Sequence, residues 1–172
     1  MRSYAPSKLI WSIRYAAMAH EFELTSPQFN PGGLIPKEHT CDGRNTSPAL
    51  RWSHPPDNTK SLVLIVDDPD APRGTFVHWV AFNIPPEFNG RVLPAGVAFD
   101  ADQGVVEGAN DFGDTGFGGP CPPRGSEHRY IFRLYALDAD LAPSEGASKK
   151  QVTQAMQGHV LGEANLVGIY RR

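Results

Sequence analysis

Three short segments of the sequence carry side chains that could bind an anion or move a proton. An acidic run contains Asp68 and Asp70, and later segments contain His78 and the pair His128 and Tyr130. A histidine on an apolar strand needs a polar partner, because burying an unpaired imidazole is costly. A carboxylate can be that partner, and imidazole, phenol and backbone N–H groups together suit a small anion such as phosphate. These residue types therefore predict an anion-binding site, provided that the fold brings the three segments together.

The same residue types also occur in purely structural roles. The run Asp68-Pro-Asp-Ala-Pro72 can be only a rigid turn, and a histidine on an apolar strand is more often a hydrogen-bonded core residue. A hydrolase that uses Asp68 with His128 as a general acid–base pair is an alternative function. A protein-interaction module, such as an inhibitor whose pocket recognises an anionic side chain, is another. The sequence has no nucleophile elbow, zinc-protease motif or phosphate-binding loop, and no spacing selects a metal or a cofactor.

Three strands are predicted to position these residues. Strand 61–67 is a continuous apolar run of the kind buried on both faces of a sheet, and it delivers the acidic run to the rim. Strand 76–84 carries His78 and alternates so that one face holds Phe76, His78, Val80, Phe82 and Ile84. Strand 128–137 alternates in the same way, with Arg129 and Arg133 opposite a face of His128, Tyr130, Phe132, Leu134 and Ala136.

One helix, a long loop and shorter strands complete the expected fold. Ser148 is predicted to cap a helix that stops at Gly162, with an apolar face of Val152, Ala155, Met156, His159 and Val160. Segment 104–125 contains seven glycines and three prolines, and its backbone N–H groups are expected to wall the anion site. Further strands are predicted at 20–24, 49–53 and 166–170. The fold class is mostly β: a single β-sandwich-like domain.

Composition limits the function classes. The chain of 172 residues suits one domain, and 16 Lys+Arg against 19 Asp+Glu argue against nucleic-acid binding. No apolar stretch is long enough to cross a bilayer. Residues 1–20 contain no acidic residue and are predicted to be a disordered extension, translated upstream of a start at Met18, before a domain at 21–172. A cytoplasmic location is expected, with Cys41 and Cys121 as two free thiols and one bridge as the alternative.

Several motifs occur together and in order. They are Cys41-Asp-Gly-Arg-Asn-Thr-Ser-Pro48, Asp68-Pro-Asp-Ala-Pro72, His78-Trp79, Gly119-Pro-Cys-Pro-Pro-Arg-Gly125, His128-Arg-Tyr130 and Gly158-His-Val-Leu161. This combination resembles the phosphatidylethanolamine-binding protein (PEBP) family, and most closely its bacterial branch, often called Raf kinase inhibitor-like. The resemblance covers Phe22 to Tyr170. The first twenty residues match nothing in the family, and the stretch from Pro123 to His128 is shorter than in many members.

The resemblance implies a fold, a site and a function. The fold is an antiparallel β-sandwich with a large central sheet, a smaller sheet and a few short helices. The ligand-binding residues carried over from the family's pocket are Asp68, Asp70, His78, Pro122, Pro123, His128 and Tyr130. In the family this pocket binds phosphate-bearing groups such as phosphoethanolamine and is not known as a catalytic centre. We therefore expect non-enzymatic binding of small phosphorylated or other anionic ligands, without cofactor or metal.

Partners other than a small ligand are less constrained by the sequence. Eukaryotic members of the family regulate kinases, so modulation of a protein partner such as a kinase is an additional expectation. Fold and pocket alone do not fix such a partner. The exposed late helix can support a homodimer.

Overall fold

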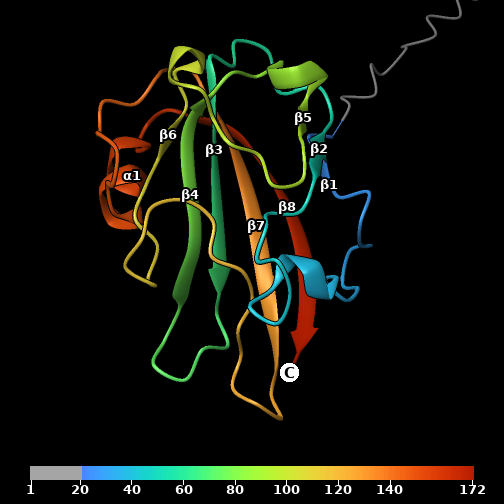
Figure 1. Cartoon of the computed structure of the whole chain (residues 1–172). Coiled ribbons are helices and arrows are strands. Elements are labelled where there is room, and N and C mark those ends of the chain that lie inside the picture. Colours follow the sequence, from blue (N-terminus) through green and yellow to red (C-terminus); the bar gives the residue numbers. More distant parts are fainter. Residues whose placement is uncertain (1–20) are drawn as a thin grey trace, which may run out of the picture.

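Two antiparallel sheets form the framework of residues 21–172, the part of the chain that this computed structural model describes (Figure 1). The prediction for residues 1–20 lies outside the described residues. The large sheet has the order β6 (Val106–Glu107), β4 (Phe76–Ile84), β3 (Ser61–Asp68), β7 (Glu127–Leu137) and β8 (Val160–Arg171). The small sheet has the order β1 (Leu24–Thr25), β2 (Leu50–Trp52) and β5 (Val92–Leu93). The predicted mostly β fold with a large and a smaller sheet is confirmed.

The large sheet is covered on both faces. The small sheet packs on one face, and helix α1 (Lys149–Ala155) lies on the other (Figure 1). All eight residues of β3 are buried, as expected for a continuous apolar strand between two layers. The β7 alternation is also confirmed: His128 and Tyr130 are buried, whereas Arg129 is exposed. Three 3₁₀ turns, Lys37–His39, Phe88–Gly90 and Ala101–Gln103, supply the remaining short helices.

The predicted single face of β4 is wrong beyond His78. Val80 and Phe82 pack towards α1, whereas Ile84 packs towards the small sheet. Two irregularities in the pairing with β3 interrupt the alternation. At the first, Val66 pairs with Trp79 while Asp67 pairs with Val77, so His78 is the extra residue of a β-bulge. At the second, Asn83 has a left-handed backbone with φ 58°.

The predicted helix is correct at its start and wrong at its end. The Ser148 side chain accepts a hydrogen bond from the Gln151 backbone, which is the expected capping box. The helix ends at Ala155, and the chain turns at Gly158 with φ 82° before β8 begins at Val160. Extended pairing with β7 over the whole of β8 overrides the helical spacing. His159 therefore lies outside the helix, where its Nδ1 is 2.7 Å from Asp138 Oδ1.

The ends of four strands lie together at one end of the large sheet, beside the C-terminus in Figure 1. β3 ends and β4 begins there, because Asp68 pairs with Phe76. β7 begins and β8 ends there, because Glu127 pairs with Arg171. This register brings the acidic run and both predicted site histidines to the same end of the sheet.

The two cysteines are joined, so the prediction of two free thiols is wrong and the alternative of one bridge is correct. Cys41 follows the first 3₁₀ turn and Cys121 lies in the loop before β7, 80 residues later. Their Cα atoms are 5.4 Å apart, within the range that a disulfide requires. The spacing in sequence carries no sign of this approach, which depends on how the two loops fold over the sheet.

No described helix has the length and apolar character needed to cross a membrane.

Candidate functional site

A pocket of about 330 Å³ opens at the end of the large sheet where the four strand ends lie together. Five of the seven predicted site residues line it: Asp68, His78, Pro122, Pro123 and His128. Sequence reasoning missed the other lining residues, which are Ala71, Pro72, Phe76, Phe112, Cys121 and Arg172. The predicted Asp70 and Tyr130 are not lining residues. The pocket therefore combines a buried polar end with walls that are mainly apolar.

Asp68 and His128 form a buried pair at the polar end. His128 Nδ1 is 2.7 Å from Asp68 Oδ2, and both side chains are almost fully buried. The other oxygen of the carboxylate, Oδ1, accepts a hydrogen bond from the backbone N–H of Asp70 at 2.8 Å. Both Asp68 oxygens are thus engaged by the protein. This leaves Nε2 as the His128 nitrogen that has no hydrogen bond to another described residue and is available to a ligand.

His78 is oriented by the glycine-rich loop. Its Nδ1 is 2.6 Å from the backbone oxygen of Gly118. A carbonyl oxygen can only accept, so Nδ1 carries the proton, and in the neutral ring Nε2 presents a lone pair. Burial lowers the pKa of His78, with the Gly118 hydrogen bond opposing that shift. At neutral pH His78 is therefore an acceptor at Nε2, and it becomes a donor there only when it takes up a second proton.

Burial of His78 is expected to make the protein less stable towards acid. The unfolded chain binds this proton at the ordinary histidine pKa, whereas the folded chain resists it until a lower pH. The free energy of unfolding should therefore fall as pH decreases from 7 to 5, by at most about 1.4 kcal/mol per pH unit for one group. Urea titrations should show that His78→Gln flattens this fall, whereas His54→Gln, a change at an exposed histidine, does not. Equal slopes for wild type and His78→Gln would contradict the assignment.

Tyr130 lies beneath His78 and is fully buried. The two rings meet edge to face, with centroids 5.2 Å apart and an interplanar angle of 87°. Burial raises the pKa of Tyr130, so its phenol stays protonated at neutral pH. By distance and angle its Oη has no hydrogen-bond partner among the described residues, although the Cys121 backbone N–H lies close enough to oppose the rise of the pKa. Tyr130 therefore supports the His78 ring from below and is not itself exposed to the pocket.

Asp70 does not line the pocket and pairs instead with Arg129. Its carboxylate receives two hydrogen bonds from the Arg129 guanidinium, at 2.9 and 2.8 Å, and one from the Arg129 backbone N–H at 2.9 Å. The Arg129 side chain holds the pKa of Asp70 down, from 3.8 to about 2. Asp70 therefore fastens the acidic turn to β7, and this geometry supports a positioning role.

Asp70→Asn tests that role. The pair is partly exposed, so its loss should cost no more than about 1 kcal/mol of unfolding free energy. The contribution should be complete above pH 3.8 and disappear as pH falls towards 2, because the folded-state pKa is depressed. Anion affinity measured by calorimetry should stay within about twofold of wild type. A much larger loss of affinity would place Asp70 in the binding site.

The chain matches a known protein family over almost all of its described length. The family model for phosphatidylethanolamine-binding proteins matches residues 25–171. The chain belongs to the phosphatidylethanolamine-binding protein family. A UPF0098 protein of Methanothermobacter thermautotrophicus is 54% identical over 149 residues, which cover 87% of this chain and 98% of the relative.

Two solved structures share the PEBP fold. CT736 of Chlamydia trachomatis, described as a PEBP homologue, superposes with a TM-score of 0.82 at 40% identity, covering 88% of this chain and 98% of that one. YbcL of Escherichia coli, described as a member of the mammalian PEBP family, gives a TM-score of 0.78 at 36% identity, covering 88% and 99%. The resemblance seen in the motifs is thereby confirmed over almost the whole described chain.

The wall of this PEBP pocket differs from the predicted one. Its loop was expected to offer free backbone N–H groups, but Gly118 donates to the His78 backbone oxygen at 2.8 Å and Gly119 donates to Asn45 Oδ1 at 2.8 Å. Gly119 also allows the close approach of the two loops, because a Cβ there would lie 2.4 Å from Asn45 Oδ1. The wall is therefore made of prolines and aromatic rings rather than amides.

Phe112 forms the outer aromatic part of that wall. Its ring packs edge-on against Phe76 and His78, with centroid distances of 4.8 and 5.3 Å. The Phe112 side chain is nevertheless exposed. Its place is set by Asn110, whose Oδ1 accepts from the Phe112 backbone N–H at 3.0 Å. The only sequence signal for this residue was a large aromatic side chain inside a glycine-rich loop.

Arg172 supplies a permanent positive charge to the pocket wall. Its Nε donates to Asp42 Oδ1 at 3.1 Å, and its Nη1 lies 3.5 Å from Cys121 Sγ. Asp42 also accepts a hydrogen bond from Tyr170 Oη at 2.8 Å, and this bond together with Arg172 lowers the pKa of Asp42. Pairing of β7 with β8 could have placed Arg172 near His128, but its contacts with Asp42 and Cys121 join segments that are distant in sequence.

Asp67 belongs to a separate cluster. It precedes Asp68 on β3, so its side chain points to the opposite face of the sheet. There Oδ2 accepts from Arg133 Nη1 at 2.9 Å and from Lys149 Nζ at 2.6 Å. The cluster joins α1 to the sheet and does not contribute to the pocket.

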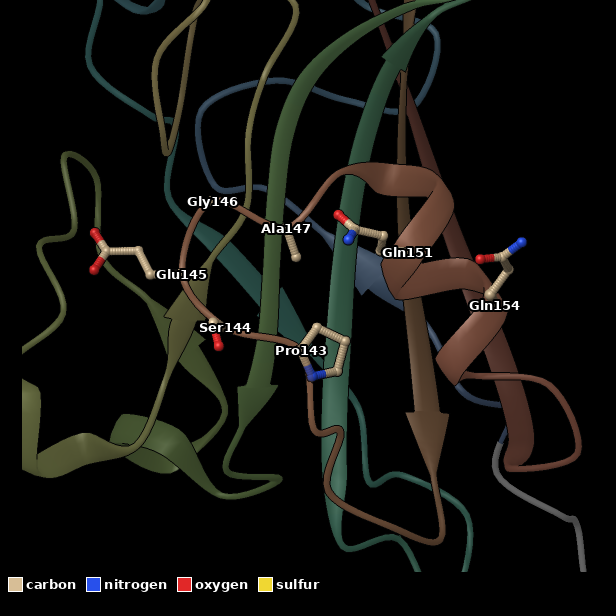
Figure 2. A pocket seen from close by; sticks show the side chains of 7 residues that line it. All are labelled: Pro143, Ser144, Glu145, Gly146, Ala147, Gln151 and Gln154. Atoms are coloured by element: carbon tan, nitrogen blue, oxygen red, sulfur yellow. The ribbon is translucent and has the colours of Figure 1, made fainter.

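A second hollow, of about 460 Å³, lies between α1 and the segment before it (Figure 2). Glu145 is its only ionisable lining residue, and in Figure 2 the Glu145 carboxylate points away from Gln151 and Gln154. This hollow offers little chemistry. Within residues 21–172, no group of three or more His, Cys, Asp or Glu side chains is placed to hold a metal ion.

Proposed function

We propose that the protein binds small phosphate-bearing ligands in the pocket at the end of the large sheet that Asp68, His78 and His128 line. The observation that carries this proposal is the pair of oriented imidazoles, each fixed through Nδ1 by a protein oxygen. Each ring therefore has Nε2 left for a ligand. Small phosphorylated groups such as phosphoethanolamine are the ligands that family membership favours.

The groups around the pocket suit an anion that is itself protonated, or one that binds together with a proton on an imidazole. Arg172 contributes a guanidinium at the wall, whose Nε is paired with Asp42. The two Nε2 atoms accept from a protonated phosphate, or donate to a dianion once a ring is protonated. An apolar group attached to the phosphate would contact Phe76, Phe112 and the prolines.

Binding without catalysis is the function that the lining residues favour. The Asp68–His128 pair has the geometry of a general base, so hydrolysis requires a direct test. The pocket lining contains no serine or threonine, and its one cysteine is bridged, so the lining offers neither a hydroxyl nor a free thiol as a nucleophile. Turnover of a phosphate or acyl ester that disappears in His128→Ala would favour the hydrolase.

Calorimetric titration with phosphoethanolamine at fixed ionic strength tests the proposal. Wild type should bind, and His128→Ala should bind at least about tenfold more weakly, because one charge-assisted hydrogen bond is lost. His54→Ala is the matched control, since His54 is exposed and pairs with Glu87. A melting curve for each variant separates loss of binding from loss of folding. Absence of binding by folded wild type would remove phosphate recognition as the function.

A protein partner such as a kinase, a homodimer and a cytoplasmic location stay predictions. If the partner presents an anionic side chain, the same pocket would recognise it. Affinity capture with wild type should then retain a partner that folded His128→Ala loses.

A further inference from the structure

One cysteine of the disulfide lines the pocket, and neither cysteine is fully buried. Cys121 lines the pocket beside Pro122 and Pro123, and it is only partly buried. Cys41, the other half of the bridge, is exposed. Exposed disulfides are the ones that thiols open most readily. Thiol exchange at this bridge would therefore act directly on the wall of the pocket.

Other contacts hold the same two loops together. The Cys41 backbone N–H donates to the Pro120 oxygen at 3.1 Å, and Gly119 donates to Asn45 Oδ1 at 2.8 Å. Tyr170 and Arg172, at the end of β8, both donate to Asp42 next to Cys41 and so hold the Cys41 loop to the large sheet. Opening the disulfide is therefore expected to leave the fold in place while it frees the Cys121 side chain within the wall.

The two sulfurs differ in their surroundings. Arg172 Nη1 is 3.5 Å from Cys121 Sγ, whereas among residues 21–172 no side chain donates a hydrogen bond to Cys41 Sγ. The other ionisable groups that face the pocket are Asp68, His78 and His128. A guanidinium favours the thiolate form of a neighbouring cysteine, and the sulfur that is better stabilised as a thiolate is the better leaving group.

We propose that Cys41–Cys121 is a thiol-exchange site that controls the anion pocket: a small thiol attacks Cys41, and Cys121 remains in the wall as a thiolate paired with Arg172. The thiolate then competes with a bound anion for the same positive charge. The last step depends on the proposed function, whereas the exchange and the state of Cys121 do not.

The exchange is balanced with a small monothiol or dithiol as reductant. The reductant's thiolate attacks Cys41 Sγ, a new S–S bond forms, and the Cys41–Cys121 bond breaks with its electron pair on Cys121. A second thiolate then attacks the reductant's sulfur in the mixed disulfide and releases Cys41. The two reductant thiols are oxidised to one disulfide. Their two electrons pass to the protein, whose disulfide is reduced to two cysteines.

Competition for Arg172 fixes the direction of the coupling. A thiolate beside Arg172 cancels charge that the anion would use, so reduction lowers anion affinity. By linkage, a bound anion disfavours the thiolate by the same factor. A phosphate ligand should therefore slow alkylation of reduced Cys121.

Peptide mapping tests which sulfur is attacked. The full-length protein is treated briefly with glutathione, quenched with N-ethylmaleimide and digested with trypsin, which places Cys41 in peptide 38–44 and Cys121 in peptide 92–124. Glutathione is expected on peptide 38–44 and maleimide on peptide 92–124. The reverse pattern, or no reaction of the folded protein, would overturn the exchange site.

Alkylation rates test the role of Arg172. In protein reduced with dithiothreitol, iodoacetamide alkylates a thiolate with formation of an S–C bond and release of iodide. Cys121 should react several-fold faster than Cys41, and Arg172→Gln should remove this difference. Arg171→Gln is the matched control, because Arg171 pairs with Glu127 at 2.6 Å. Equal rates for both cysteines in folded wild type would refute the retained thiolate.

Titration of oxidised and reduced wild type with phosphoethanolamine completes the test. Reduction is expected to weaken binding at least about threefold, and phosphoethanolamine is expected to slow Cys121 alkylation. Equal affinity in the two redox forms would overturn the competition. Failure of the oxidised protein to bind would overturn the proposed function instead, while the mapping and alkylation results would still decide the exchange site.

Discussion

Replacement of both cysteines by serine is expected to lower the free energy of unfolding by about 4 kcal/mol. The bridge closes a loop of 80 residues, and a cross-link restricts the unfolded chain more as the closed loop becomes longer. The folded state loses little by comparison, because backbone and side-chain hydrogen bonds still join the two loops. For a domain of this size the melting temperature should fall by roughly 8–16 °C.

Urea unfolding of wild type, reduced wild type and Cys41→Ser/Cys121→Ser measures this effect. The reduced protein and the double variant should unfold at similar urea concentrations, because both lack the cross-link. The single variant Cys41→Ser should behave in the same way, since either change breaks the bridge. A difference between oxidised and reduced protein of less than about 1 kcal/mol would show that the unfolded chain is not restricted as the loop length predicts.

The parts of the fold that the sequence predicted are those with a strong local pattern. β3 is an uninterrupted apolar run and β7 alternates without a break, so burial follows directly from residue type. β4 could not be predicted in full, because the bulge at His78 and the left-handed Asn83 arise from pairing with β3. The predicted end of α1 was wrong for a related reason. The apolar spacing that predicted a helix continues to Val160, but β8 begins there and pairs with β7.

The candidate site also has residues that the local sequence predicted and residues that it did not. Asp68, His78 and His128 were predictable, because a buried histidine on an apolar strand needs a polar partner: His128 has Asp68, and His78 has the Gly118 oxygen. Asp70 was predicted as a site residue from its position in a motif; in the structure it pairs with the Arg129 guanidinium and does not line the pocket. Arg172 and the disulfide were out of reach, because both depend on contacts between residues 51 or more positions apart.

Phosphate affinity is expected to fall by almost tenfold for each pH unit between pH 7 and 9, or about 100-fold over the range. Burial lowers the pKa of His78, and its Nδ1 donates to the Gly118 oxygen, so its neutral ring offers only a lone pair at Nε2. A phosphate dianion also offers only lone pairs, and the two repel unless one proton is added. The complex then holds one more proton than the separate partners, and raising pH removes it.

Calorimetry in two buffers of different ionisation enthalpy measures this proton directly: uptake should approach one per ligand above pH 7. Affinity that stays constant from pH 7 to 9, with no proton uptake, would mean that Arg172 holds the anion without help from the imidazoles. Sulfate locates the proton, because it stays fully ionised in this range while resembling phosphate in size and shape. If sulfate binds with the same pH dependence, the proton is on an imidazole. If phosphate binds and sulfate does not, the proton is on the ligand and the neutral Nε2 atoms accept it, so the pocket selects anions that can donate a hydrogen bond.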